Sequence, residues 1–64
     1  TSSYAAFKLA QFASDNLDFE NAVKYGEISL SMNKDIFYTD YITEEIKKYK
    51  WMADNLDYIE PLME

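Results

Sequence analysis

The chain has 64 residues, with no cysteine or histidine, and twelve acidic residues against six lysines give it a net charge of −6. This length supports one domain. Without cysteine the chain has no disulfide, thiolate zinc site or thiol nucleophile, which favours a reducing, cytoplasmic setting. Without histidine it lacks the commonest general base and metal ligand. The acidic charge disfavours nucleic acid and favours a partner that carries lysine or arginine.

The composition predicts an all-α domain over residues 1–64, an antiparallel three-helix bundle. One glycine and one proline in 64 residues indicate helices joined by short loops. The apolar runs are only a few residues long, so the sequence predicts no membrane span, signal sequence or direct membrane insertion. The chain begins at Thr1 rather than Met, so we expect a fragment of a longer protein.

The first predicted helix covers residues 3–15 and begins at a Ser2 or Ser3 cap. Tyr4 and Phe7 lie off its main apolar stripe, so we expect them to be only partly buried near the chain ends. At 100° per residue, one broad face carries the residues expected to enter the core, namely Ala5, Ala6, Leu9, Ala10, Phe12 and Ala13.

The second predicted helix covers residues 19–33, with Asp18 as its N-cap. Gly26 in mid-helix costs about 1 kcal/mol relative to alanine, which predicts a close helix crossing there. The expected core stripe is Phe19, Val23 and Leu30, with the small residues Ala22, Gly26 and Ser29 beside it. A second apolar strip is either further core or one wall of a groove, and it consists of Tyr25, Ile28 and Met32.

The third predicted helix covers residues 39–60 and is expected to end before Pro61. Ile36 and Phe37, in the preceding loop, are expected to plug the end of the bundle. Trp51 and Tyr58 lie opposite the core, either as partner contacts or as aromatic rings lying along lysine stems. The expected core stripe is Ile42, Ile46, Tyr49, Ala53 and Leu56. We expect seven residues of the three helices to be mostly buried, namely Leu9, Ala13, Val23, Leu30, Ile46, Tyr49 and Ala53.

A short sequence motif, which we call the echo, occurs twice in the chain. The sequence Asp-Asn-Leu-Asp followed by an aromatic residue occurs at residues 15–19 and again at residues 54–58. The spacing is in the range of helical repeat proteins. The flanking sequences match poorly, however, so we interpret the echo as coincidence.

The acidic and basic residues lack the arrangement of an active site. Glu44 and Glu45 are adjacent and point to different helix faces, and the acids near Asp15 lack the spacing and the glycine of a calcium loop. Lys47 and Lys48 follow Glu44 at three and four residues, so pairing within the helix explains them. We expect a binding domain and not an enzyme, with no catalytic residue, metal or cofactor.

The helices resemble those of MIT (microtubule interacting and transport) domains. Residues 49–56 resemble the closing helix of that family, with a tyrosine (Tyr49), an alanine–acid pair (Ala53 and Asp54) and a leucine (Leu56). Residues 18–25 look like the start of its second helix and residues 4–13 like its first. The version of the third helix seen here looks closest to archaeal members attached to the AAA ATPases of cell division.

This resemblance implies a monomeric, cytoplasmic adaptor that binds C-terminal tails of ESCRT-III-like filament proteins and recruits a parent AAA ATPase to membrane-associated filaments. Such tails are basic peptides with leucine or proline. The family has one groove between its second and third helices and another between its first and third. Two departures from the family favour the groove between the first and third helices. The connection between the second and third helices is short, and Lys50 stands where the second–third groove often presents a leucine.

The resemblance also implies where partner-binding residues should lie. Near the first–third groove we expect Phe7, Lys50, Asp54 and Asp57, and near the second–third groove Tyr25, Ile28, Met32, Met52 and Ile59, while Trp51 is a further candidate contact. The alternative is a tetratricopeptide-repeat fragment acting as a peptide-binding or scaffold segment, because residues 6–34 satisfy much of one repeat. The pattern does not return at the 34-residue period of that family.

Overall fold

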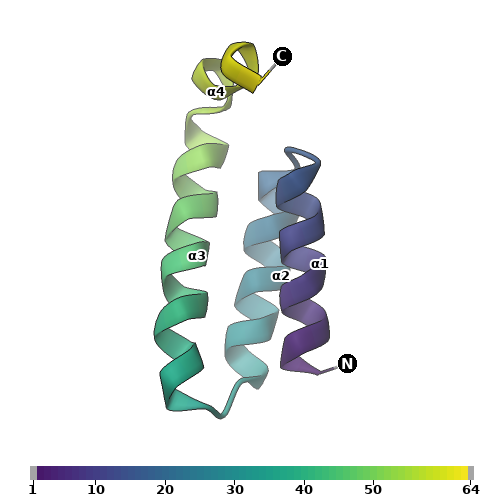
Figure 1. Cartoon of the computed structure of the whole chain (residues 1–64), viewed down its shortest axis with the longest axis vertical. Helices are drawn as coiled ribbons and strands as arrows, with labels where there is room; N and C mark the ends of the chain where they lie inside the picture. The colour runs from purple at the N-terminus through teal and green to yellow at the C-terminus, as the bar shows by residue number, and fades with distance from the viewer. Residues whose placement is uncertain (1, 64) are drawn as a thin grey trace.

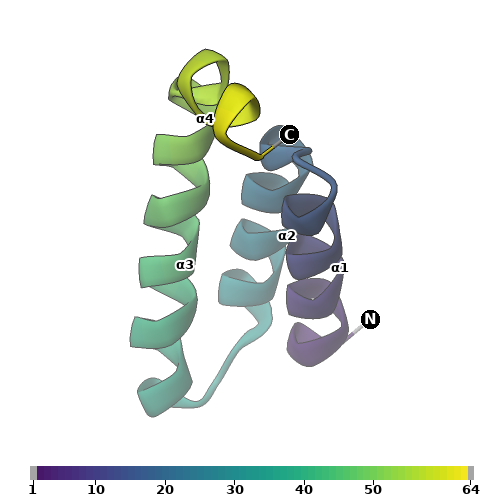
Figure 2. The same ribbon diagram turned by 45° about the horizontal axis from the view of Figure 1, so that its top comes forward.

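The computed structural model describes the backbone of residues 2–63 and the side chains of residues 2–59, and within residues 2–63 it contains helices and no strand. The helices are α1 (Ser3–Asp15), α2 (Phe19–Met32), α3 (Ile36–Asp54) and α4 (Leu56–Met63). α1 and α2 form an antiparallel hairpin, α3 returns along α2, and α4 turns over the end of α3 (Figures 1 and 2). The prediction of an all-α bundle is confirmed, and the bounds of the first helix are correct.

The turn between α1 and α2 is tight, and backbone N–H groups of the turn donate to backbone carbonyls at the end of α1. Leu17 N donates to Ser14 O at 2.9 Å and Asp18 N donates to Ala13 O at 2.8 Å, the two bonds of a Schellman helix end. Leu17 has a φ of 61°, which a residue with a side chain rarely adopts. Its side chain packs against the core, and that contact offsets the backbone cost. Asp18 then caps α2 at once, as predicted.

Small residues form the contact between α1 and α2. Ser3 lies opposite Ser29, and in an antiparallel pair this register places Ala6 opposite Gly26 and Ala10 opposite Ala22. All four of these small residues are buried. We call this contact the α1–α2 seam, and it comprises Ala6, Ala10, Ala13, Ala22 and Gly26. Short side chains let the two backbones approach closely, so the larger residues must pack to either side.

Two apolar clusters join the hairpin to α3. In one, Tyr49 of α3 packs among Ala10, Ala13, Phe19 and Ala22. In the other, Phe7 packs with Ile42 and Ile46, and its ring meets the edges of Tyr38 and Tyr41 at centroid distances of 6.2 and 5.5 Å. The predicted burial of Ala13, Ile46 and Tyr49 is confirmed, while Val23, Leu30 and Ala53 are only partly buried.

The predicted buried face of the first helix is partly wrong. Phe7 is only 2% exposed, whereas Leu9 and Phe12 are 46% and 69% exposed. Ala6, Ala10 and Ala13 of the seam are buried, as predicted. Apolar residues lie on both flanks of the seam, and either flank could have packed against α3. α3 packs on the flank that carries Phe7, so the flank with Leu9 and Phe12 stays in solvent.

The start of α3 also differs from prediction. The helix begins at Ile36, with Asp35 as its cap accepting a bond from Phe37 N at 3.0 Å. The Asn33 side chain stabilises the position of Asp35, because its Nδ2 donates to Asp35 O at 2.7 Å. Ile36 and Phe37 therefore occupy the first turn of a helix at the end of the bundle, where they are 76% and 89% exposed. The prediction that they plug the bundle end is wrong.

The predicted third helix is interrupted at Asn55. The Asn55 side chain donates to Trp51 O at 2.7 Å and ends α3, and the new helix α4 continues through Pro61. The predicted span of 39–60 and the predicted stop at Pro61 are therefore wrong. Asn16 ends α1 in the same way, donating from Nδ2 to Phe12 O at 2.8 Å. The two copies of Asp-Asn-Leu-Asp therefore lie at two helix ends that share the same asparagine hydrogen bond.

A pair of serines, one of them fully buried, fixes one end of the hairpin. Ser3 Oγ donates to Ser29 O at 2.8 Å, and Ser29 Oγ donates to Ser3 O at 2.8 Å. Ser29 is fully buried on α2, so its hydroxyl has no access to water as a substitute partner. The two reciprocal bonds hold the first residue of α1 against the end of α2.

We expect Ser29→Ala to destabilise the fold by about 1–2 kcal/mol, because it removes the hydrogen bond from the buried Ser29 hydroxyl to Ser3 O. The matched control is Ser31→Ala, since the Ser31 hydroxyl is exposed and bonds only to Ile28 O on its own helix. Urea unfolding followed by circular dichroism measures both. Equal losses of stability for the two variants would contradict a special role for the serine pair.

The predicted close crossing at Gly26 is confirmed. A methyl group at this position would lie 2.9 Å from Cγ1 of Ile46 on α3. Alanine at Gly26 would gain about 1 kcal/mol of helix propensity but force the packed Ile46 to move. The contact explains why a helix-weakening residue stands in the middle of α2.

We expect Gly26→Ala to lower the free energy of unfolding, because overpacking costs about 1–3 kcal/mol and outweighs the propensity gain. In a double-mutant cycle with Ile46→Ala, the same change should become neutral or stabilising, since the clashing atoms are gone. Thermal unfolding of the four proteins measures the coupling. Additive effects would show that Ile46 is not the obstacle.

Candidate functional site

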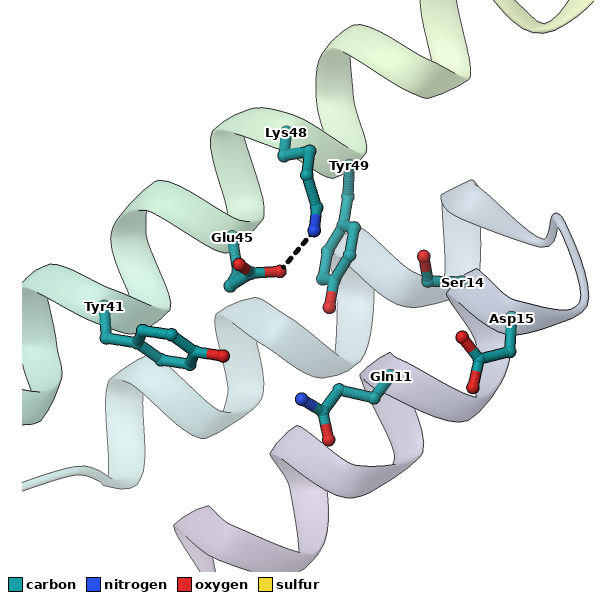
Figure 3. Close-up of a pocket in the computed structure, with 7 residues that line it drawn as sticks. All are labelled: Gln11, Ser14, Asp15, Tyr41, Glu45, Lys48 and Tyr49. Atoms are coloured by element: carbon teal, nitrogen blue, oxygen red, sulfur yellow. Dashed lines mark ion pairs between the residues drawn. The ribbon is translucent and has the colours of Figure 1, made fainter. Parts of the chain in front are cut away.

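A groove of about 360 Å³ lies between α1 and α3. It exists because α3 rests on α2, while it approaches α1 mainly through the side chains of Phe7 and Tyr49. Figure 3 shows the residues that line it on its two sides, Gln11, Ser14 and Asp15 from α1, and Tyr41, Glu45, Lys48 and Tyr49 from α3.

The side chains of this groove are polar and include both signs of charge. Glu45 and Lys48 form an ion pair at 2.9 Å, one turn apart on α3. Asp15, on the opposite wall, has no lysine within 4.0 Å among the described residues. The groove therefore has a net negative charge and one carboxylate that is free to meet a cation.

Tyr49 forms the floor between the walls. Burial of its ring, with the Glu45 carboxylate close by, raises the pKa of Tyr49 from 10.0 to about 12. The phenol is thus held in its neutral form, and its hydroxyl points towards α1 (Figure 3). Together with the Gln11 amide and the Ser14 hydroxyl, it offers hydrogen-bonding groups to whatever enters the groove.

A second groove, of about 420 Å³, lies between α2 and α3 and is lined by Glu20, Val23, Lys50, Ala53 and Asp54. Lys50 pairs with Glu27 at 3.5 Å across it. Lys50 and Asp54 were expected at the first–third groove, and that placement is wrong. Both lie on the α2 side of α3, because Ile46 and Ala53 face α2 on the same side of the helix.

The other predicted contact residues do not gather at one place. Phe7 is core, Ile59 is buried on α4, and Met52 is partly buried against the Tyr49 cluster. Trp51 and Asp57 are exposed, away from the linings of both grooves. Tyr25, Ile28 and Met32 were expected along the second–third groove but do not line it. Their helical positions place them on the side of α2 that faces away from α3.

Sequence reasoning missed the α1 wall of the first groove. Gln11, Ser14 and Asp15 were not among the residues predicted to bind a partner, because the buried stripe was assigned to the wrong flank of the seam. A usable signal was present on α3, where Tyr41, Glu45 and Lys48 recur at steps of four and three and so form one stripe.

Within the described residues, no cluster of acidic side chains could hold a metal ion, and no helix is long and apolar enough to cross a membrane. Comparison with protein-family models, with curated proteins and with solved structures finds no match to this chain. The functional interpretation rests on the geometry and chemistry of the chain itself.

The raised pKa of Tyr49 predicts a loss of stability at alkaline pH. The folded protein holds this proton more tightly than the unfolded chain, so stability is fully present below pH 10 and falls as pH rises towards 12. Tyr49→Phe should flatten the pH dependence of the unfolding free energy between pH 10 and 12. Denaturant unfolding over that range tests this, with Tyr58→Phe, an exposed tyrosine on α4, as the control.

Proposed function

We propose that this domain is a protein–protein interaction module that binds a short, basic, extended peptide in the groove between α1 and α3. The proposal rests mainly on the lining of that groove. There the unpaired carboxylate of Asp15 on α1 faces the residues that α3 contributes, Tyr41, Glu45 and Tyr49. No group in it has the arrangement of a nucleophile with its base, which favours binding over catalysis.

An extended peptide suits this groove better than a helical one. A helix satisfies its own backbone and binds through an apolar face, so it requires an apolar groove. An extended segment presents free backbone N–H and C=O groups, and the amide, hydroxyl and phenol groups of Gln11, Ser14 and Tyr49 are suited to them. A lysine or arginine of the peptide would reach Asp15.

The affinity should be in the micromolar range. A groove of this size buries far less surface than the roughly 1,600 Å² of a stable interface, and its ionic contact is solvent-exposed. Such weak binding suits reversible recruitment, in which several copies act together.

The resemblance to MIT domains supports a more specific proposal. The partner is then a basic, proline- or leucine-containing C-terminal tail of an ESCRT-III-like filament protein. The domain, itself monomeric and cytoplasmic, recruits a parent AAA ATPase to membrane-associated filaments. The acidic surface and the predicted preference for the first–third groove are consistent with this proposal.

The test is a heteronuclear NMR titration of the domain with a basic tail peptide that contains proline and leucine. We expect saturable shifts at Gln11, Tyr41 and Glu45, and weaker binding at higher salt because charges contribute. Asp15→Lys should weaken binding about fivefold to tenfold, by roughly 1 kcal/mol or slightly more, since it places a like charge against the peptide.

Asp54→Lys is the matched control. Asp15 and Asp54 are the exposed last residues of α1 and α3, each followed by a capping asparagine, so both substitutions change the same local context. Asp54 lines the α2–α3 groove, and its substitution should leave affinity unchanged. A loss caused by Asp54→Lys alone would move the site to that groove, and no saturation at millimolar peptide would refute the function.

A further inference from the structure

The side of the α1–α2 hairpin opposite α3 carries an uncovered apolar surface. On α1 it consists of Ala5, Leu9 and Phe12, at steps of four and three, and on α2 of Tyr25, Ile28 and Met32, at steps of three and four. All except Tyr25 are solvent-exposed, and Tyr25 is half-buried against the Ala10 and Ala13 cluster. We call these six residues the outer face.

The two rows of the outer face are offset along the hairpin and overlap near Ala5 and Tyr25. With Ser3 opposite Ser29, Phe12 lies level with Glu20, and Ile28 lies level with Tyr4. At 3.6 residues per turn, Leu9 and Phe12 are turned by about 140–160° from Phe7, the α1 residue that meets α3. Ile28 and Met32 are turned similarly from Leu30, which packs towards α3. Each row thus flanks the α1–α2 seam on the side away from α3, and Figures 1 and 2 show α3 on only one side of the hairpin.

Two lysines border the outer face. Lys8 borders the α1 row and Lys24 the α2 row, each on the edge remote from the seam. Their ammonium groups lie over the rings of Tyr4 and Tyr25, at 5.4 and 6.0 Å from the ring centroids. Neither has a carboxylate within 4.0 Å among the described residues, whereas Lys47, Lys48 and Lys50 are all paired.

We propose that the outer face binds an amphipathic helix of a partner protein whose apolar stripe is flanked by acidic residues. Two antiparallel helices present an apolar face on which a third helix packs, and lysines on both edges select carboxylates on both flanks. The charge preference is opposite to that of the α1–α3 groove, although the whole chain is acidic. The two sites are therefore separate and accept different ligands.

The dimensions set the length of the partner segment. Each row extends over seven residue steps, which is about 10 Å at 1.5 Å per residue. Because the rows are offset, together they extend over about twelve residue steps, roughly 18 Å. A helix of between three and four turns covers both rows and places side chains at i, i+3, i+4, i+7, i+8 and i+11 against them. Phe12 and Leu9 are the largest side chains of the α1 row and serve as the apolar anchors on that side.

The experiment compares two designed peptides that share one leucine stripe at these positions, one flanked by glutamates and one by lysines. We expect the glutamate peptide to bind the 64-residue chain at least tenfold more tightly, with NMR shifts at Leu9, Phe12, Ile28 and Met32. Lys8→Glu with Lys24→Glu should weaken that binding about tenfold, and Phe12→Asp should do the same without lowering the unfolding temperature.

The matched control is Lys47→Glu with Lys50→Glu, which changes the net charge equally at exposed positions on α3, away from the outer face. It should leave the affinity for the glutamate peptide within about twofold. Equal or tighter binding of the lysine peptide, shifts confined to the α1–α3 groove, or no binding at millimolar peptide would overturn the proposal. So would sedimentation showing that a second copy of this chain covers Phe12. Binding of the basic tail peptide is measured separately, so either site can fail alone.

Discussion

The packing of α1 on α2 through small side chains determines on which side of the hairpin the large side chains of these two helices lie. Ala10 meets Ala22 and Ala6 meets Gly26, so the seam itself fills little volume. Large residues on the same helices must then stand to one side of the seam or to the other. Phe7 and Phe19 stand on the side that α3 covers, and Leu9, Phe12 and Ile28 stand on the side that it does not. The buried core and the exposed outer face are two consequences of one contact.

The same contact explains the groove on the α3 side. Gly26 lets Ile46 approach α2 closely, and this draws α3 onto α2 and leaves its approach to α1 to side chains. Tyr49 spans that space with a ring long enough to reach the Ala10 and Ala13 cluster. The ring forms the floor of the groove but does not fill the space above it. Polar residues of α1 and α3 therefore face each other across an open groove. A smaller residue at position 49 would leave a hole in the core, and a helix packed directly on α1 would leave no groove.

Much of this fold follows from the sequence, and the errors have specific physical causes. Caps and periodicity correctly gave α1 and the start of α2, and Gly26 correctly predicted a close crossing. The register of α1 failed because both flanks of the seam are apolar, and only the position of α3 decides between Phe7 and Phe12. That position depends on long-range packing, which helical periodicity does not contain. The site residues Gln11 and Ser14 were lost through the same error.

The break at Asn55 was, by contrast, readable from the chain. Asp-Asn-Leu-Asp ends α1 at Asn16, and the same four residues recur at the end of α3. In both places the asparagine side chain donates to the carbonyl four residues earlier, on the last turn of the helix. Treating the echo as coincidence discarded a local rule that does not depend on a repeat fold. The outcomes after the break differ, since Leu17 adopts a left-handed backbone and reverses the chain, whereas Leu56 starts a new helix directly. The motif therefore determines where a helix ends, and the packing available to the next apolar residues determines where the chain goes afterwards.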